Sequence, residues 1–353
     1  MRMSRDTIGT LAIVMLFVAI AFLIFIGTGI KSATKLMEAE VDNNIEATTA
    51  SYSHDVSMKF GQMMDKTNDL ASIIKTDFST EEYAASPDSY IADYSESHSD
   101  VIKEFLSQSK DISGLYVMFD DKNTKEPVEV WYTRKGGKVE RTYANLDRMK
   151  EERELKNKDT AYFFNTLKTE EGVWTGLYYD GNLDQDVFSF TRSVYVDGQF
   201  IAVIGADITQ RDSVGMLDNK EKYPEGHVAI FDENGKYVIK QEKIEYDESL
   251  ALDKAYAKAR TSDPKNSNGV FSLDTKTGER IAGYSTLDNG WSFVFSKSEK
   301  SAYQSVYKIQ RMVVFIGAAL LFVVIVLMFS FLSLLVSKSQ RQQKAENQKK
   351  EEE

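Results

Sequence analysis

The sequence predicts an α+β protein in which two membrane-spanning helices flank a long helix and two antiparallel-sheet modules in series. Three observations predict this architecture. Uncharged apolar segments lie near both ends of the chain, a helical pattern without proline follows the first segment, and β-rich runs separated by glycine turns follow that pattern. With 353 residues, the chain is long enough for about two domains of ordinary size.

The apolar segments, residues 7–30 and 312–336, carry no charge. Each exceeds the roughly 20 apolar residues that span a bilayer as a helix. A cleaved signal peptide is the alternative for the first segment, but its apolar region is too long and no A-x-A-like cleavage site follows it. We therefore predict two transmembrane helices in a multi-pass protein of the cell membrane, in contact with the lipid bilayer.

Basic residues outside these spans indicate the orientation. Arg2 and Arg5 lie in the short N-terminal segment 1–6, and five Lys and Arg residues lie in the segment 337–353. The positive-inside rule then places both ends in the cytoplasm and residues 31–311 outside. The last segment contains neither proline nor glycine, so we interpret it as the start of a cytoplasmic signalling helix.

Composition excludes several functions. The sequence has no cysteine, which removes disulfides, thiolate nucleophiles and Cys-rich metal sites. Each terminal segment adds about one positive charge to a total of −11, so the part between them carries about −13, which disfavours binding to nucleic acid. His98 and His227 have no second histidine at metal-ligand spacing, and we predict no metal site and no cofactor.

The first external segment, residues 31–80, predicts a long helix. Apolar residues recur in it at intervals of three, four and seven, and no proline appears before Pro87. A one-sided stripe of this kind packs against its own domain or against a dimer partner. We expect a parallel homodimer through this helix. The stripe consists of Val41, Ile45, Thr48, Tyr52, Val56, Phe60, Met63, Leu70 and Ile74.

Beyond about residue 110 the pattern changes to strands and tight turns. Runs such as GLYVMF and HVAIFDENGKYVI are rich in β-formers, and Asp-Gly, Asn-Gly and Thr-Gly pairs predict hairpins between them. Helical pieces are expected near residues 90–109, 144–169 and 247–260. A polar stretch before His227 separates a first module, residues 81–215, from a second module, residues 216–305. We expect the first to lie farther from the membrane.

The order of these elements resembles the double Cache sensor domain, a PAS-like domain of bacterial transmembrane receptors, over roughly residues 31–305. The most specific pieces are VWTGLYYD, then FSFTRSVYVDGQFIAVIGADI, and later GERIAGYSTLDNGWSFVFSKSE. The resemblance implies a ligand-sensing receptor that is not an enzyme. Its output domain is expected to be of the histidine kinase or diguanylate cyclase type. Because the sequence contains no such domain, we expect it in a longer protein or in a separate partner.

In this family, many amino-acid-binding members share an Arg-x-Trp-Tyr segment, a Tyr-x-Asp segment and an Asp that closes a Gly-x-Asp strand. The first falls on TAYF at 160–163, where Thr160 replaces the arginine that holds a ligand carboxylate. A hydroxyl does not replace a bidentate guanidinium, although Arg192 or Arg134 can supply one if either reaches the pocket. The ligand-binding residues so implied are Tyr162, Phe163, Trp174, Tyr178, Asp180, Arg192 and Asp207.

The chemistry of these residues favours an amine. A buried carboxylate is costly unless it is paired, and a ligand ammonium can pair with Asp180 and Asp207 while aromatic faces add cation–π attraction. The alternative is that both carboxylates end strands and accept hydrogen bonds from turn amides. The run from Asp180 to Thr191 also begins like a calcium loop, but its sixth and twelfth positions are Gln185 and Thr191 instead of Gly and Glu.

The sequence thus predicts an external sensor of a small amine-bearing or cationic molecule. A chemoreceptor for amino acids or carboxylates remains an alternative, and so does a membrane-anchored protein that binds a partner without sensing. The three scattered histidines and the missing cysteines offer no catalytic constellation, which disfavours an external enzyme.

Overall fold

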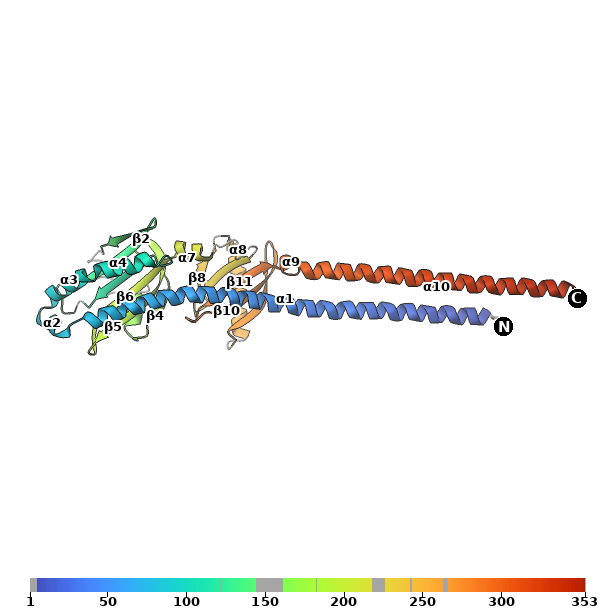
Figure 1. Ribbon diagram of the computed structural model, residues 1–353, viewed down its shortest axis with the longest axis horizontal. Helices are drawn as coiled ribbons and strands as arrows, with labels where there is room; N and C mark the ends of the chain where they lie inside the picture. The colour runs from blue at the N-terminus through green and yellow to red at the C-terminus, as the bar shows by residue number, and fades with distance from the viewer. Residues whose placement is uncertain are drawn as a thin grey trace. The chain divides into compact units, whose positions relative to one another are not determined.

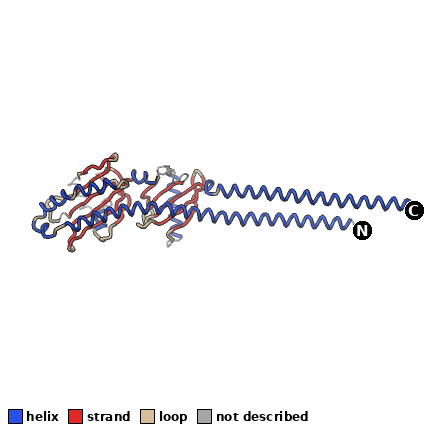
Figure 2. The backbone as a smooth tube through the Cα atoms, viewed as in Figure 1, coloured by secondary structure: helices blue, strands red, loops and turns tan. Residues whose placement is uncertain are grey.

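The structure is a computed structural model that describes residues 5–120, 122–143, 161–181, 183–217, 226–241, 243–262 and 266–352. The chain divides into two units. Residues 1–44 and 300–353 make up the first, here named the helical unit, and residues 45–299 make up the second, named the sheet unit. The α+β fold class is confirmed, with long helices at both ends of the chain and two antiparallel sheets between them (Figures 1 and 2).

The helical unit consists of the first part of α1 (Arg5–Asp77), most of α9 (Glu299–Ala302), and α10 (Gln304–Glu352). Its two long helices lie side by side and antiparallel. The amide of Gln310 donates to the hydroxyl of Thr34 at 2.8 Å, and Tyr303 donates to Asp42 at 3.5 Å. Gly317 faces Ile26, where an added Cβ would lie 3.2 Å from the isoleucine side chain.

Both helices have the character of membrane spans. Within the described residues, Ile13–Asp77 and Gln304–Ala345 are long and apolar enough to cross a membrane. Their large apolar side chains are exposed, Phe25 by 74% and Phe315 by 76%. Exposed apolar surface of this extent marks an interaction with lipid or protein, so the two apolar helices predicted from the sequence are present.

The sheet unit contains the rest of α1 and a series of shorter elements. In chain order these are α2 (Thr80–Ala85), α3 (Pro87–Ser97), α4 (Ser99–Gln108), β1 (Gly114–Phe119), β2 (Glu129–Lys135), β3 (Lys138–Thr142), α6 (Ala161–Thr166), β4 (Val173–Asp180), β5 (Gln185–Val196), β6 (Gln199–Thr209), α7 (Gln210–Leu217), β7 (Gly226–Phe231), β8 (Tyr237–Lys240), α8 (Tyr246–Ser262), β9 (Asn268–Thr275), β10 (Gly278–Thr286) and β11 (Ser292–Ser298).

Within this unit, α1 packs against both sheets. Ser53 donates a hydrogen bond to Ser285 of β10 at 2.9 Å, and the ring of Phe60 lies 4.9 Å from Trp174 of β4 and 5.8 Å from Trp291. The predicted stripe is therefore largely packed against its own chain over this range, and the homodimer stays a prediction. The buried side chains of α1 are Ile45, Thr49, Ser53, Val56, Ser57, Phe60, Met63, Thr67, Leu70, Ala71 and Ile74.

The first module is built on a sheet in the order β3-β2-β1-β6-β5-β4, with antiparallel neighbours throughout. Helices cover one face of this sheet. Phe60 of α1 contacts Phe188 of β5, and Ser99 of α4 shares a 2.8 Å hydrogen bond with Tyr132 of β2. On the opposite face lies α6, the described part of the helical piece expected at residues 144–169; residues 144–160 are outside the described residues.

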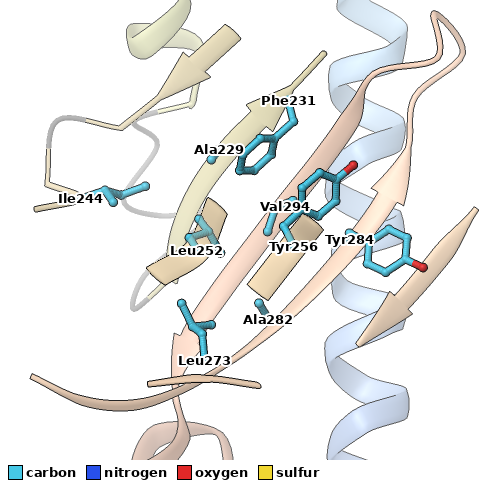
Figure 3. Packing of buried hydrophobic residues seen from close by; sticks show 9 residues of the cluster. All are labelled: Ala229, Phe231, Ile244, Leu252, Tyr256, Leu273, Ala282, Tyr284 and Val294. Carbon is cyan, nitrogen blue, oxygen red and sulfur yellow. The ribbon is translucent and has the colours of Figure 1, made fainter. Parts of the chain in front are cut away.

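The second module is built on a sheet in the order β8-β7-β11-β10-β9, and α8 covers one face of it. Figure 3 shows nine buried side chains of the core of this module, with part of the chain in front cut away. The rings of Phe231 and Tyr256 stack at 4.5 Å, and Leu252, Leu273 and Tyr284 complete a packed apolar core. Close packing of this kind is typical of a structural interior.

Candidate ligand site in the first module

One row of small and polar residues crosses the α6 face of the first sheet. The residues in it are direct cross-strand partners, so their side chains point to the same side of the sheet. The row sets Asp207 among hydroxyl groups and beside a glycine. From β2 to β4 it reads Thr133, Gly114, Asp207, Ser189 and Thr175, and the exposed Glu140 of the edge strand β3 pairs with Thr133.

Aromatic side chains surround this polar row. The ring of Tyr162, from α6, stacks on Tyr178 of β4 with centroids 5.2 Å apart and 14° between the planes. Tyr116 of β1 meets Tyr162 edge to face at 6.1 Å and contacts Trp131 of β2 at 5.2 Å. Phe163 belongs to the same buried cluster and is 8% exposed. The faces of such rings attract cations.

Asp207 is the most unusual group in the site because it is fully buried within β6. Its Oδ1 accepts a 2.5 Å hydrogen bond from Ser189, whose Oγ in turn lies 2.8 Å from the hydroxyl of Tyr178. Its Oδ2 has no hydrogen-bond partner in the part of the chain that the structure describes. Burial, followed by the negative charge of Asp180, raises the pKa of the Asp207 carboxyl well above its ordinary value.

Asp180 is held differently. It lies at the end of β4, is 7% exposed, and accepts a 2.7 Å hydrogen bond at Oδ1 from the backbone N–H of Leu183. One of its oxygens thus makes the turn contact that the structural alternative predicts. Asp207 does not follow that alternative, because it lies inside a strand and bonds to a serine hydroxyl. The negative charge of Asp180 raises the pKa of Asp207, so the two carboxyls lie close enough to interact.

Trp174 is not part of this cluster, which corrects the prediction that it forms a wall of the ligand pocket. The β4–β5 register shifts between Thr175 and Tyr178, so the bulge reverses which side chains face α6. Trp174 lies on the other face, 4.9 Å from Phe60 and 5.4 Å from Trp291. It helps to join α1, the first sheet and the second module.

Arg192 and Arg134 also lie on the α1 and α4 face, so neither supplies the guanidinium expected of amino-acid binders. Arg192 donates to the side chain of Asn68 on α1 at 2.7 Å. Arg134 donates to the carbonyls of Leu106 and Ser109 at the end of α4. In this structure Arg192 therefore lies on the opposite face of the sheet from Asp207, because even-numbered residues of β5 up to Val194 face the helices.

Two residues near Asp207 were missed by the sequence reasoning. Tyr116 is 2% exposed and Trp131 is 5% exposed, and neither the Tyr116 hydroxyl nor the Trp131 Nε1 has a hydrogen-bond partner among the described residues. Burial and the charge of Asp207 raise the pKa of Tyr116 well above its ordinary value. Alternation along 114–119 indicates which residues share a face, but not that this face meets Asp207.

Thr160, which was used in the sequence argument, and Asn182, which belongs to the run compared with a calcium loop, lie outside the described residues. Among the described residues, no group of three or more His, Asp or Glu side chains is arranged to hold a metal ion. The arrangement at Asp207 is therefore a buried acceptor among hydroxyls and aromatic faces. Chemically, it can accept hydrogen bonds from a cationic or hydroxylated ligand.

The chain matches the family model of the Cache domain over residues 33–306. It therefore belongs to the Cache domain family, a class of ligand-binding sensor modules found outside the membrane in receptors, and the resemblance seen in the sequence is confirmed. No curated protein matches the chain.

Solved structures support the same fold. The ligand-binding domain of the Campylobacter jejuni chemoreceptor Tlp3, in complex with L-valine, is 16% identical with a TM-score of 0.53, covering 76% of this chain and 97% of that one. The extracellular domain of soHK1S-Z6, named as a histidine kinase, is 14% identical with a TM-score of 0.55, covering 78% and 98%. At these identities the likeness shows the fold alone.

Proposed function

We propose that this chain is the sensing part of a transmembrane signalling receptor and that its first module binds a small amine-bearing or cationic molecule. The observation that carries the proposal is the free Oδ2 of Asp207, a fully buried acceptor with no hydrogen-bond partner in the described chain. A buried polar atom of this kind calls for an explanation, such as a ligand. A ligand ammonium satisfies the acceptor and the charge together.

The surroundings support a cationic ligand over an anionic one. No cation is among the groups that shift the pKa of Asp207, and Asp180 adds a second negative charge. The stacked pair of Tyr162 and Tyr178 provides aromatic faces for cation–π attraction. Ionised Asp207 repels a carboxylate, and both described arginines considered for that role lie on the other face of the sheet.

Two alternatives remain open to experiment. A chemoreceptor for amino acids or carboxylates is favoured by the Tlp3 domain, whose solved structure holds L-valine. In this chain such a ligand needs a cation for its carboxylate. Thr160, which stands where amino-acid binders have the arginine for that role, is outside the described residues. A membrane-anchored protein that binds a partner without sensing is the other alternative, and it predicts no response to small molecules.

We further propose that both termini are cytoplasmic, that the sheet unit is external, and that ligand binding acts on a homodimer. Binding can bias two arrangements of the membrane helices only as far as the ligand prefers one of them, typically by about 1–3 kcal/mol. The output is proposed to be a histidine kinase or a diguanylate cyclase. The protein itself is proposed to have no catalytic activity.

A thermal-shift screen of the full-length protein in nanodiscs tests the ligand proposal. The panel should hold amines, amino acids, carboxylates and purines, since a ligand at 100 times its dissociation constant adds about 2.7 kcal/mol of stability. Calorimetry with the best amine should then show binding weakened by roughly two to three decades in Asp207→Ala. Asp186→Ala is the matched control, because Asp186 is an exposed residue of β5. Equal affinity in wild type and Asp207→Ala would refute this site.

Cysteine labelling tests the topology, because the sequence has no cysteine of its own. Ser89→Cys and Gln340→Cys place single thiols at exposed positions in the sheet unit and in α10. An impermeant maleimide should label intact cells at position 89 and not at position 340. Labelling of position 340 alone, or of both equally, would contradict the proposed orientation.

A further inference from the structure

The indole of Trp131 and the carboxylate of Asp207 converge over Gly114. A Cβ added to this glycine would lie 3.1 Å from Nε1 of Trp131 and 3.2 Å from Oδ2 of Asp207. Both atoms belong to side chains that are at least nine-tenths buried, and neither has a hydrogen-bond partner in the described chain. A buried donor and a buried acceptor therefore face the same small region without bonding each other.

This pair restricts which chemical group can satisfy it. The indole N–H only donates, and an ionised carboxylate only accepts. An ammonium alone satisfies Asp207 but leaves Trp131 without an acceptor. A ligand carboxylate alone accepts from Trp131 but leaves Asp207 without a donor. A hydroxyl both accepts and donates, so one oxygen can accept from Trp131 and donate to Asp207.

We infer that the ligand of the first module is a small vicinal amino alcohol, which has its ammonium and hydroxyl on adjacent carbons. This inference rests on the proposed amine-binding function and names its ligand class. The ammonium and the hydroxyl donate to the same carboxylate, which has lone pairs for both because Ser189 occupies only Oδ1. Adjacent carbons keep the two donors close enough to share that acceptor.

Tyr116 supports the same assignment from the next row of the sheet. It is the cross-strand partner of both Trp131 and Gly205, and its hydroxyl is a third buried group without a hydrogen-bond partner in the described residues. A phenol can donate or accept, so it can complete the hydrogen bonds of a ligand hydroxyl. Gly205 leaves room for it, because a Cβ there would lie 2.2 Å from the phenol oxygen.

A pair of matched probes tests this inference. Ethanolamine and propylamine have the same number of heavy atoms and the same charge near neutral pH, and they differ in a hydroxyl against a methyl group. Calorimetry on the full-length protein in nanodiscs should show ethanolamine binding roughly tenfold more tightly than propylamine, as expected for a hydrogen bond to buried polar groups. The ratio of the two affinities is the measured quantity.

Trp131→Phe should lower this ratio severalfold, because phenylalanine keeps an aromatic body but lacks the N–H, while the ligand hydroxyl keeps its bond to Asp207. Trp174→Phe is the matched control. Trp174 also has a buried Nε1 without a hydrogen-bond partner in the described chain, but it lies on the opposite face of the sheet. The control should keep the wild-type ratio, and unfolding temperatures near that of the wild type should confirm that both variants are folded.

The outcomes separate the inference from the proposed function. Equal binding of both amines by the wild type, or a ratio unchanged in Trp131→Phe, overturns the amino-alcohol inference and leaves the amine-binding function standing. Loss of the ratio in Trp174→Phe as well as in Trp131→Phe also overturns it, because the effect would then not depend on the face. Failure of both amines to bind, together with failure of every amine in the broader screen, overturns the proposed function itself.

Discussion

The two modules of the sheet unit treat a buried carboxylate in opposite ways. In the second module, Glu248 at the start of α8 lies 2.5 Å from Nδ1 of His227 and 3.1 Å from Nε of Arg280. In the first module, Asp207 bonds only to Ser189 through Oδ1, and its Oδ2 has no hydrogen-bond partner among the described residues. Glu248 is paired with a cation of its own chain, Arg280, and Asp207 is not paired with one among the described residues.

The side chains that cover one face of each sheet differ as well. On the α8 face of the second sheet large side chains pack on one another, and Figure 3 shows Phe231, Tyr256 and Tyr284 among them. The α6 face of the first sheet also carries packed aromatic side chains, but a row of small and polar residues with Asp207 in it lies among them. The two modules therefore differ in whether a buried polar row interrupts the packed face.

The largest expected effect is on the stability of the second module. Glu248→Ala should lower its free energy of unfolding by about 3–5 kcal/mol, because it leaves the buried Arg280 without its partner. Denaturant unfolding followed by fluorescence measures this change. Asp247→Ala is the control, since its ion pair with Lys276 is partly exposed and should be worth less than about 1 kcal/mol. Similar losses in both variants would show that the buried group has no structural role.

The opposite result is expected at Asp207. Asp207→Asn should weaken amine binding by roughly two to three decades and leave the free energy of unfolding unchanged or higher, because a neutral amide needs neither a buried charge nor the bound proton that neutralises one. Calorimetry and denaturant unfolding of the same samples measure the two effects. A large loss of stability would instead indicate that Asp207 is structural, like Glu248.

The pH dependence of binding sharpens the comparison. Because burial raises the pKa of Asp207, its carboxyl carries a proton in the free protein at pH values where an ordinary aspartate is ionised. The folded state then holds more protons than the unfolded state, so stability from this group is present at low pH and decreases as pH rises through that interval. An ammonium ligand needs the ionised form. Amine affinity should rise by up to about tenfold per pH unit below the raised pKa, and Asp207→Asn should remove that slope.

The smallest expected effect concerns Arg192. Arg192→Met removes the hydrogen bond to Asn68 and should cost about 1 kcal/mol of stability. Its effect on ligand affinity should stay within about threefold, since the side chain lies on the helix-facing side of the sheet. A loss of affinity beyond tenfold would return Arg192 to the ligand site.

Much of the fold followed from the sequence because its signals are local. The uncharged spans, the proline-free helical stripe and the glycine turns each depend on residues close together in the chain, and the structure has the corresponding helices and hairpins. The partner of the stripe on α1 was not predictable in this way. The sequence left open whether the stripe packs against its own domain or against a second chain. The structure buries Phe60 and Leu70 of the stripe within the same chain.

The candidate site was predictable only where the family motif pointed to it. Tyr162, Phe163 and Tyr178 meet in one cluster, and the charge of Asp180 raises the pKa of Asp207. Trp174 was misplaced because a bulge in β4 reverses the alternation of side chains, and periodicity in one strand does not reveal a bulge. Trp131 and Tyr116 were missed because their relation to Asp207 depends on pairing with a strand far along the chain.

The sequence by itself determined the main secondary structure and the apolar spans, because these depend on composition and local pattern. Its resemblance to the Cache family pointed to Asp180 and Asp207, but nothing in the sequence pointed to the buried Glu248. Only the tertiary structure decided which carboxylate is paired and which is not. Glu248 meets His227 and Arg280, whereas Arg134 and Arg192 lie on the far face from Asp207. The reason is physical: strand register sets the face on which each side chain lies, and a shift of one residue moves a charge to the opposite side of the sheet.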